Sequence, residues 1–136
     1  MKKTTFTILI LLFATSTFCQ NSTNVEFTGV WTVKNATISK GLDSEVHNMM
    51  QMMKEAFINS QFIFRKDGKF ELKLKENAPE IIKELTFLNG QNWIYDPEKT
   101  KLEVGNNHLV MFVEKQNGKY YFAFSDTPII LEMEKS

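Results

Sequence analysis

The chain has 136 residues, with 16 basic and 16 acidic side chains, 43% hydrophobic residues and one cysteine. This length suits one domain and excludes a large multidomain enzyme. Zero net charge without a basic block argues against a nucleic-acid-binding protein, because phosphate recognition needs clustered positive charge.

Residues 1–19 are predicted to be an export signal. Lys2 and Lys3 precede a largely apolar run over residues 6–14, and small and polar residues lead up to Cys19. This layout is typical of a secretory signal and is too short to span a bilayer. We expect cleavage before Gln20 and a periplasmic or secreted protein, with residues 20–24 as a short tail and residues 25–136 as the folded domain. Cleavage would remove the cysteine, so no disulfide is expected, and we expect no membrane-spanning segment after the signal.

An alternative is that Cys19 becomes the lipid-modified first residue of a bacterial lipoprotein, which would anchor the domain to a membrane. Phe18 stands where such motifs have a small residue, and Ser16 replaces the usual aliphatic residue. We therefore favour cleavage before Gln20.

After the signal, apolar residues recur at every second position in eight short runs, the pattern of strands with one buried face. In the clearest run, residues 69–75, three apolar side chains alternate with four charged ones. The other runs are residues 27–38, residues 61–65, Trp93 and Tyr95, Leu102 and Val104, Leu109, Met111 and Val113, Tyr120, Phe122 and Phe124, and Ile129, Leu131 and Met133. Turn-forming residues separate them at residues 67–68, 96–99, 105–107, 117–118 and 125–128. Eight such strands predict an all-β, antiparallel up-and-down barrel, because closure removes exposed sheet edges.

Two segments depart from the strand pattern. Residues 44–58 are predicted to form a helix between the first and second strands, with Asp43 or Ser44 as its N-cap. Its apolar stripe consists of Val46, Met49, Met50, Met53 and Phe57.

Residues 78–88 are ambiguous. Asn77 and Glu80 have capping-box spacing, Pro79 would lie in the first turn, and Ile81, Ile82, Leu85 and Leu88 share one side. Residues 85–88 followed by Asn89-Gly90 could equally form the first arm of a hairpin. We favour the helix.

Phe27, Gly29 and Trp31 match the aromatic-x-Gly-x-Trp pattern that opens the first strand of lipocalins and the wider calycin group. A glycine lets the strand bend, and the tryptophan can plug one end of the barrel. Over residues 24–135 the chain resembles the small lipocalin-like proteins exported by Bacteroidota-type bacteria. The resemblance implies a basic side chain packed on the motif tryptophan, for which Lys135 is the nearest match. The inserted helix is similar in position to the lid of intracellular fatty-acid-binding proteins.

The alternation places ten side chains inside the barrel. They are Phe27, Trp31, Phe62, Phe64, Phe70, Trp93, Tyr95, Met111, Phe122 and Phe124. An eight-stranded barrel can be filled by side chains or can hold one small ligand. Our first hypothesis is a binding protein for a small apolar ligand, lipid-like or aromatic, with Met50, Met53 and Phe57 lining the lid.

The second hypothesis is a filled barrel that acts as a protein-interaction or inhibitor module of the cell envelope. Its partner surface would be the apolar residues of opposite parity, Ile63, Val110, Phe112, Tyr121 and Ile130. We expect instead that a helix covers Val110, Phe112 and Tyr121.

Metal binding and catalysis have less support in the sequence. The histidine and methionines of residues 47–53 would suit Cu(I), but methionine also fills irregular gaps in apolar stripes. We therefore expect no metal and no cofactor. His47 and His108 are the only histidines, and neither lies in a motif with a serine nucleophile, so we expect no enzymatic activity.

Overall fold

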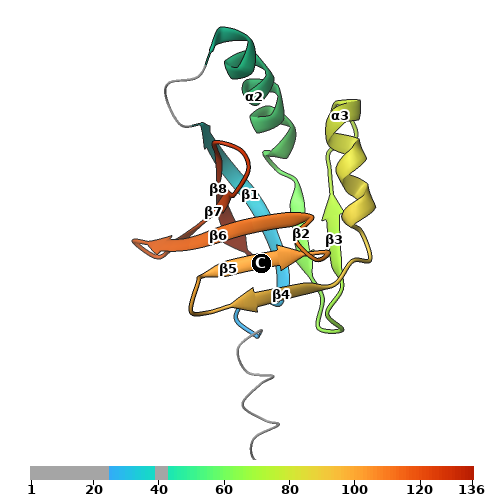
Figure 1. Ribbon diagram of the computed structural model, residues 1–136, viewed down its shortest axis with the longest axis vertical. Helices are drawn as coiled ribbons and strands as arrows, with labels where there is room; N and C mark the ends of the chain where they lie inside the picture. Colours follow the sequence, from blue (N-terminus) through green and yellow to red (C-terminus); the bar gives the residue numbers. More distant parts are fainter. Residues whose placement is uncertain (1–24, 39–42) are drawn as a thin grey trace, which may run out of the picture.

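The computed structural model describes residues 25–38 and 43–136 (Figure 1). The predicted signal, the tail and Cys19 lie outside the described residues. The described chain forms one sheet of eight antiparallel strands that is nearly closed into a barrel. The strands are β1 (Gly29–Ile38), β2 (Gln61–Phe64), β3 (Phe70–Lys73), β4 (Trp93–Asp96), β5 (Lys101–Val104), β6 (Leu109–Gln116), β7 (Lys119–Phe124) and β8 (Ile129–Lys135). The predicted all-β fold class is confirmed.

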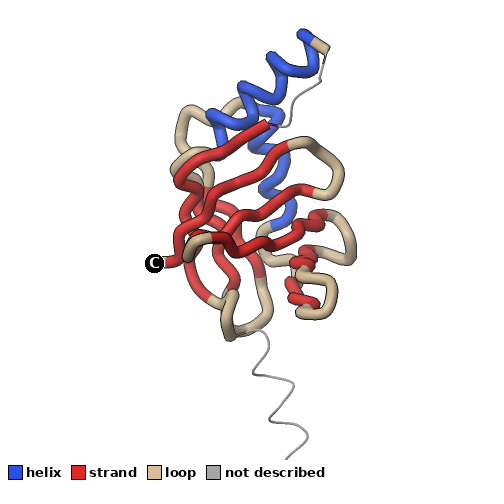
Figure 2. The backbone as a smooth tube through the Cα atoms, turned by 90° about the vertical axis from the view of Figure 1, so that its left-hand side faces the viewer, coloured by secondary structure: helices blue, strands red, loops and turns tan. Residues whose placement is uncertain are grey.

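The sheet order is β3-β2-β1-β8-β7-β6-β5-β4, so strands that follow one another in sequence pair with each other except β3 and β4, and β1 also pairs with β8. β1 and β8 pair along most of their length, which joins the two ends of the folded chain. The register shifts once between Val33 and Asn35, a bulge that bends β1. This is the predicted up-and-down arrangement, and Figure 2 shows the strands wrapping around one interior.

The barrel closes between β3 and β4, where pairing is shortest. An isolated antiparallel bridge joins Lys69 to Asn92. Beside it, Phe70 N–H donates to Gln91 O and Gly90 N–H donates to Phe70 O, each over 2.8 Å. These bonds join β3 to β4 at one end of the seam, by which we mean the gap between these two strands. Along the rest of the seam, the segment that connects β3 to β4 packs against β3.

Helix α2 (Ser44–Phe57) follows β1 as predicted. Asp43 occupies the N-cap position, but its side chain makes no capping hydrogen bond. Figure 1 shows that α2 stands on one end of the barrel and extends beyond it. The predicted apolar stripe is therefore buried only at its C-terminal end: Phe57 is buried, whereas Val46 and Met49 are 41% and 51% exposed.

The ambiguous segment 78–88 is helical, as we favoured. It comprises α3 (Glu80–Lys83) and the 3-10 helix η1 (Glu84–Leu88). The expected capping box is wrong: Pro79 is the N-cap residue and no side-chain capping bond forms. A proline at this position lacks only an N–H that the helix would leave unpaired. η1 packs against β3.

The centre of the barrel is filled by aromatic side chains in mutual contact. Trp31, Phe64 and Phe122 are fully buried. Ring centroids lie 5.3 Å apart for Trp31 and Phe122, 5.3 Å for Phe64 and Phe70, and 5.1 Å for Phe64 and Trp93. Aromatic pairs prefer such tilted or edge-to-face contacts. The interior therefore holds a packed core over this part of its length.

Candidate functional site

A pocket of about 120 Å³ lies at the end of the barrel on which α2 stands. It is formed where four chain connections meet: α2, the α3–η1 segment, the β5–β6 turn and the β7–β8 turn. In an up-and-down barrel every second connection lies at the same end, and these four are the β1–β2, β3–β4, β5–β6 and β7–β8 connections. The pocket thus occupies the space between the packed core and the helices.

The apolar wall of the pocket combines helix and strand residues. Met53 and Phe57 come from α2, and Leu85 and Leu88 come from η1. The strands contribute Phe62, Leu72, Leu109, Val110 and Phe124. The ring of Phe57 meets that of Phe124 edge-on, with 5.4 Å between centroids. An apolar cavity of this kind releases poorly solvated water when an apolar ligand enters.

The C-terminal end of α2 is fixed to the sheet, which positions Met53 and Phe57. The buried Ser60 donates its hydroxyl to Phe57 O over 2.5 Å. Val33 N–H of β1 donates to Ser60 O over 3.0 Å. Lys75 Nζ donates to Glu55 O over 2.7 Å. These bonds hold the last turn of α2 over the barrel, whereas residues 44–49 of its first turns are exposed.

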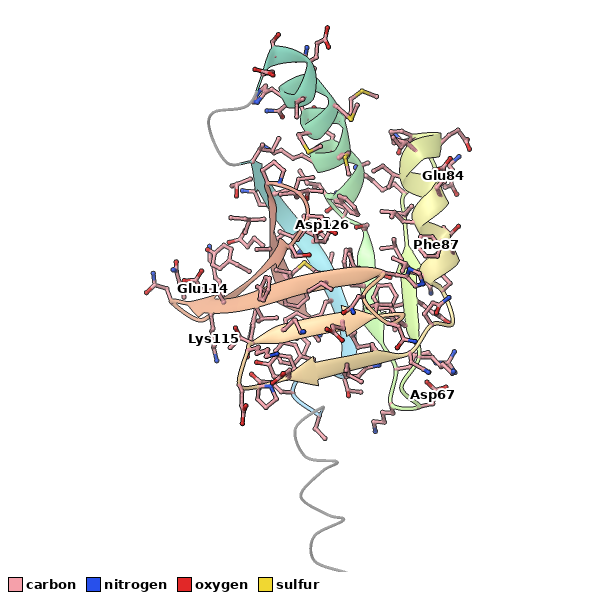
Figure 3. All side chains as sticks on the ribbon, in the orientation of Figure 1. Asp67, Glu84, Phe87, Glu114, Lys115 and Asp126 are labelled. Atoms are coloured by element: carbon pink, nitrogen blue, oxygen red, sulfur yellow. The ribbon has the colours of Figure 1, made fainter. Side chains whose placement is uncertain are left out.

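The remaining residues that line the pocket are polar. His108 follows the β5–β6 turn, and Ser125, Asp126 and Thr127 form the β7–β8 turn. Figure 3 shows Asp126 at this end of the barrel, below α2. Thr127 Oγ1 is buried and has no hydrogen-bond partner among the residues that the structure describes. The His108 ring packs edge-on against Phe87, with centroids 5.6 Å apart.

The predicted interior residues fall into two groups. Phe62 and Phe124 line the pocket, together with Met53 and Phe57 of the predicted lid. The remaining members lie in the packed core or at the other end of the barrel: Phe27, Trp31, Phe64, Phe70, Trp93, Tyr95, Met111 and Phe122. Met50 packs against the core without lining the pocket. Whether any of these residues contacts a ligand stays a prediction.

The end of the barrel opposite the pocket is plugged by the motif residues. Trp31 Nε1 donates to Phe27 O over 2.8 Å, and both side chains are buried. Lys135 Nζ lies 5.9 Å from the centroid of the Trp31 ring, where the family resemblance places a basic group. Nearby, burial and the negative charge of Glu26 raise the pKa of Tyr95.

Sequence reasoning missed the polar wall and the contribution of η1. Leu85 and Leu88 already shared one face of the predicted helix, so their helical spacing could have placed them on the barrel. At the level of sequence, Thr127 was considered only as part of a turn, and His108 only as a histidine without a catalytic motif. Their meeting depends on which turns lie at the same end of the barrel, and this follows from the strand topology.

Of the outer-face residues that we expected a helix to cover, Val110, Phe112 and Tyr121, the expectation is wrong for Phe112. Phe112 and Ile130 are 45% and 37% exposed. The strand register places Ala123 between them, so the three residues form a row across β6, β7 and β8. The helices are elsewhere, because α2 stands on the barrel end and η1 packs against β3.

The histidine and methionine side chains of residues 47–53 lie in different surroundings. His47 Nε2 and Gln51 Nε2 lie 3.2 Å apart on the exposed side of α2. Met49 and Met52 are also exposed, whereas Met53 faces the pocket. Within residues 25–38 and 43–136 no group of three histidine, cysteine or acidic side chains could hold a metal ion.

Comparisons with protein-family models, with curated proteins and with solved structures found no match to this chain. Over the described parts of the chain, no helix is long and apolar enough to cross a membrane. The fold of this chain, including the helix after β1, is consistent with a lipocalin-like barrel.

Proposed function

We propose that this chain is an exported, lipocalin-like, non-catalytic binding protein for a small apolar ligand. The observation that carries the proposal is the pocket between the packed core and the helices, with its apolar wall of side chains from α2, η1 and four strands. Ligand sites typically combine such a concave apolar surface with a few polar groups. Export is supported by the signal-like pattern of residues 1–19.

The volume of the pocket limits what it can hold. Pockets for drug-sized molecules measure roughly 300–1,000 Å³, whereas a dry cavity of about 150 Å³ holds one benzene molecule. At about 120 Å³ this pocket accommodates roughly one small ring. A longer lipid chain would have to extend past α2 into solvent, because aromatic side chains fill the barrel below.

Toluene is the simplest probe of this function. We expect the chain to bind toluene and the methyl signal of Met53 to shift in an NMR titration, because Met53 lines the pocket. Leu85→Trp should abolish the shift by filling the pocket. Ile81→Trp is the matched control, since Ile81 is exposed and does not line the pocket, and it should retain binding. The proposal fails if toluene leaves Met53 unmoved in the parent chain.

A second candidate function is a protein-interaction or inhibitor module of the cell envelope. The specific observation in its favour is the row of Phe112, Ala123 and Ile130 on the outer sheet face, in which Phe112 and Ile130 are exposed. Exposed apolar patches on soluble proteins often mark partner surfaces. Absence of toluene binding would favour this candidate over the first.

A further inference from the structure

The outer face of β6, β7, β8 and β1 carries a row in which large and small side chains alternate. The strand register places Phe112, Ala123, Ile130 and Thr37 opposite one another in that order. Each of the four is next to a buried residue in its own strand, so their side chains point away from the core. The row therefore has a large, small, large, small profile across the four strands.

A hollow lies at the β1 end of this row. It measures about 160 Å³ and is lined in part by Asn35, Thr37, Tyr121 and Ile130. A dry cavity of about 150 Å³ holds one benzene molecule, so the hollow has the size of a phenylalanine ring. At the other end of the row Phe112 is 45% exposed. It cannot reach the hollow of its own chain, because three strand spacings, about 14 Å, separate β6 from β1.

A second copy of the chain can bring its Phe112 to this hollow. A twofold axis that runs parallel to the strands, between β7 and β8, makes β6 of each copy face β1 of the other and β7 face β8. Phe112 then meets Thr37 of the second copy, and Ala123 meets Ile130, so that every large side chain meets a small one. An axis perpendicular to the strands would instead place Phe112 on Phe112.

The polar row next to the apolar row is complementary under the same axis. The register places Glu114, Tyr121, Glu132 and Asn35 opposite one another across the four strands. Tyr121 thus faces Glu132 of the second copy, and its hydroxyl can donate to that carboxylate. Glu114 faces Asn35 and its neighbour Lys34, which are both exposed at the bulge in β1.

One step further along the strands, the facing charges are opposite. Lys119 and Glu134 follow the Tyr120–Met133 pair of β7 and β8, and their side chains are 63% and 67% exposed. The axis brings Lys119 of each copy to Glu134 of the other, so the ion pair occurs twice. Across these rows no two like charges face each other, and such complementarity favours one partner and one orientation.

We infer that the chain forms a twofold homodimer through the outer face of β6, β7, β8 and β1, with Phe112 of each copy in the hollow of the other. This inference goes beyond the proposed ligand binding, because none of these interface residues lines the pocket beneath α2. The face covers roughly 20 by 20 Å, which is small for a protein interface. We therefore expect a weak dimer, with a dissociation constant of about 10–100 µM.

Sedimentation equilibrium of the purified protein, from about 10 µM to 1 mM, measures this dimer. Ile130→Arg should raise the dissociation constant at least about tenfold, because it places an unpaired charge in the centre of the interface. Ile94→Arg is the matched control. Ile94 is 55% exposed on β4, outside the four interface strands, so the dissociation constant should stay within about twofold. Urea unfolding shows that each variant is folded.

Charge reversal tests the twofold symmetry itself. In Lys119→Glu two acidic groups face each other at two places, and in Glu134→Lys two basic groups do so. Each variant alone should therefore dimerise at least about fivefold more weakly than the parent. An equimolar mixture of the two should recover dimers of nearly parental affinity. In the mixed dimer the two introduced side chains face each other with opposite charge, and the native Lys119 faces the native Glu134.

Three outcomes would overturn the inference. The first is a parent chain that stays monomeric at about 1 mM, which would leave the outer face to a different protein. The second is equal weakening by Ile130→Arg and Ile94→Arg. The third is a mixture of the charge variants that dimerises no better than either variant alone. Toluene binding at Met53 is measured separately, so failure of the dimer leaves the proposed function standing, and failure of toluene binding leaves the dimer standing.

Discussion

At the scale of single residues, the plugged end of the barrel depends on Gly29. This glycine has φ of +135°, a conformation that residues with a side chain rarely adopt. A Cβ at this position would lie 3.1 Å from Lys135 Cε, the side chain that reaches over Trp31. The glycine of the Gly-x-Trp motif thus permits both the backbone geometry that starts β1 and the close approach of Lys135.

Gly29→Ala should lower the free energy of unfolding by about 1–3 kcal/mol, the usual cost of a strained backbone conformation. Lys135→Ala should cost about 0.5–1 kcal/mol through loss of the cation–π contact. The double variant should be at least as unstable as Gly29→Ala, because removing the Lys135 side chain does not relieve the backbone strain at position 29. Urea unfolding followed by tryptophan fluorescence measures all three. Full rescue by Lys135→Ala would mean that steric contact alone, and not backbone strain, makes glycine necessary.

At the scale of elements, the sequence was informative wherever a local pattern decides the structure. Alternation and turn residues predicted all eight strands, and helical spacing predicted α2 and α3. The pattern did not reveal what covers each face. The stripe on α2 includes Val46 and Met49, but α2 extends beyond the barrel and leaves them exposed. Packing partners depend on tertiary geometry, which periodicity alone does not contain.

The seam between β3 and β4 could not be predicted for the same reason. β3 is an edge strand there, and the side chain of Asn89 replaces a neighbouring strand. Asn89 Oδ1 accepts the N–H of Leu72 over 2.6 Å, and Leu72 is buried. A side chain that satisfies an edge N–H removes one cause of edge-to-edge association. In the sequence, Asn89 was visible only as part of a turn.

Asn89→Ala should therefore destabilise the chain by about 1–3 kcal/mol, because the buried N–H of Leu72 loses its acceptor. Asn92→Ala provides a matched control. Asn92 Oδ1 accepts an exposed hydrogen bond from Lys69 Nζ over 2.8 Å, so its loss should change the free energy of unfolding by no more than about 0.5 kcal/mol. Equal losses in both variants, measured by urea denaturation, would contradict this account of the seam.

At the scale of the whole molecule, the barrel interior has two parts with different roles. Its centre and one end are filled by aromatic rings around Trp31 and Phe122, and its other end holds the pocket beneath α2. Alternation within single strands predicted which side chains face the interior, but not that they fill it. The pocket depends on four connections brought to one end by the topology, so the sequence pattern indicated only its strand and α2 walls.

This division predicts that stability and ligand selection can be altered separately. Phe122 is fully buried against Trp31 and Phe64. Phe122→Ala should cost about 3–5 kcal/mol by leaving a cavity in the core. Toluene affinity at the pocket, followed by the methyl signal of Met53 so that binding in the new core cavity is not counted, should stay within about twofold, a difference of roughly 0.4 kcal/mol, because Phe122 does not line the pocket.

Met53 should show the reverse behaviour, because it is only partly buried and borders the pocket. Met53→Ala should cost less stability than Phe122→Ala and should enlarge the pocket, so that naphthalene gains affinity relative to toluene. Urea unfolding gives the stability of each variant, and competition between the two arenes gives the selectivity. If Phe122→Ala changed the arene preference and Met53→Ala did not, the ligand would occupy the centre of the barrel, and the pocket beneath α2 would not be the binding site.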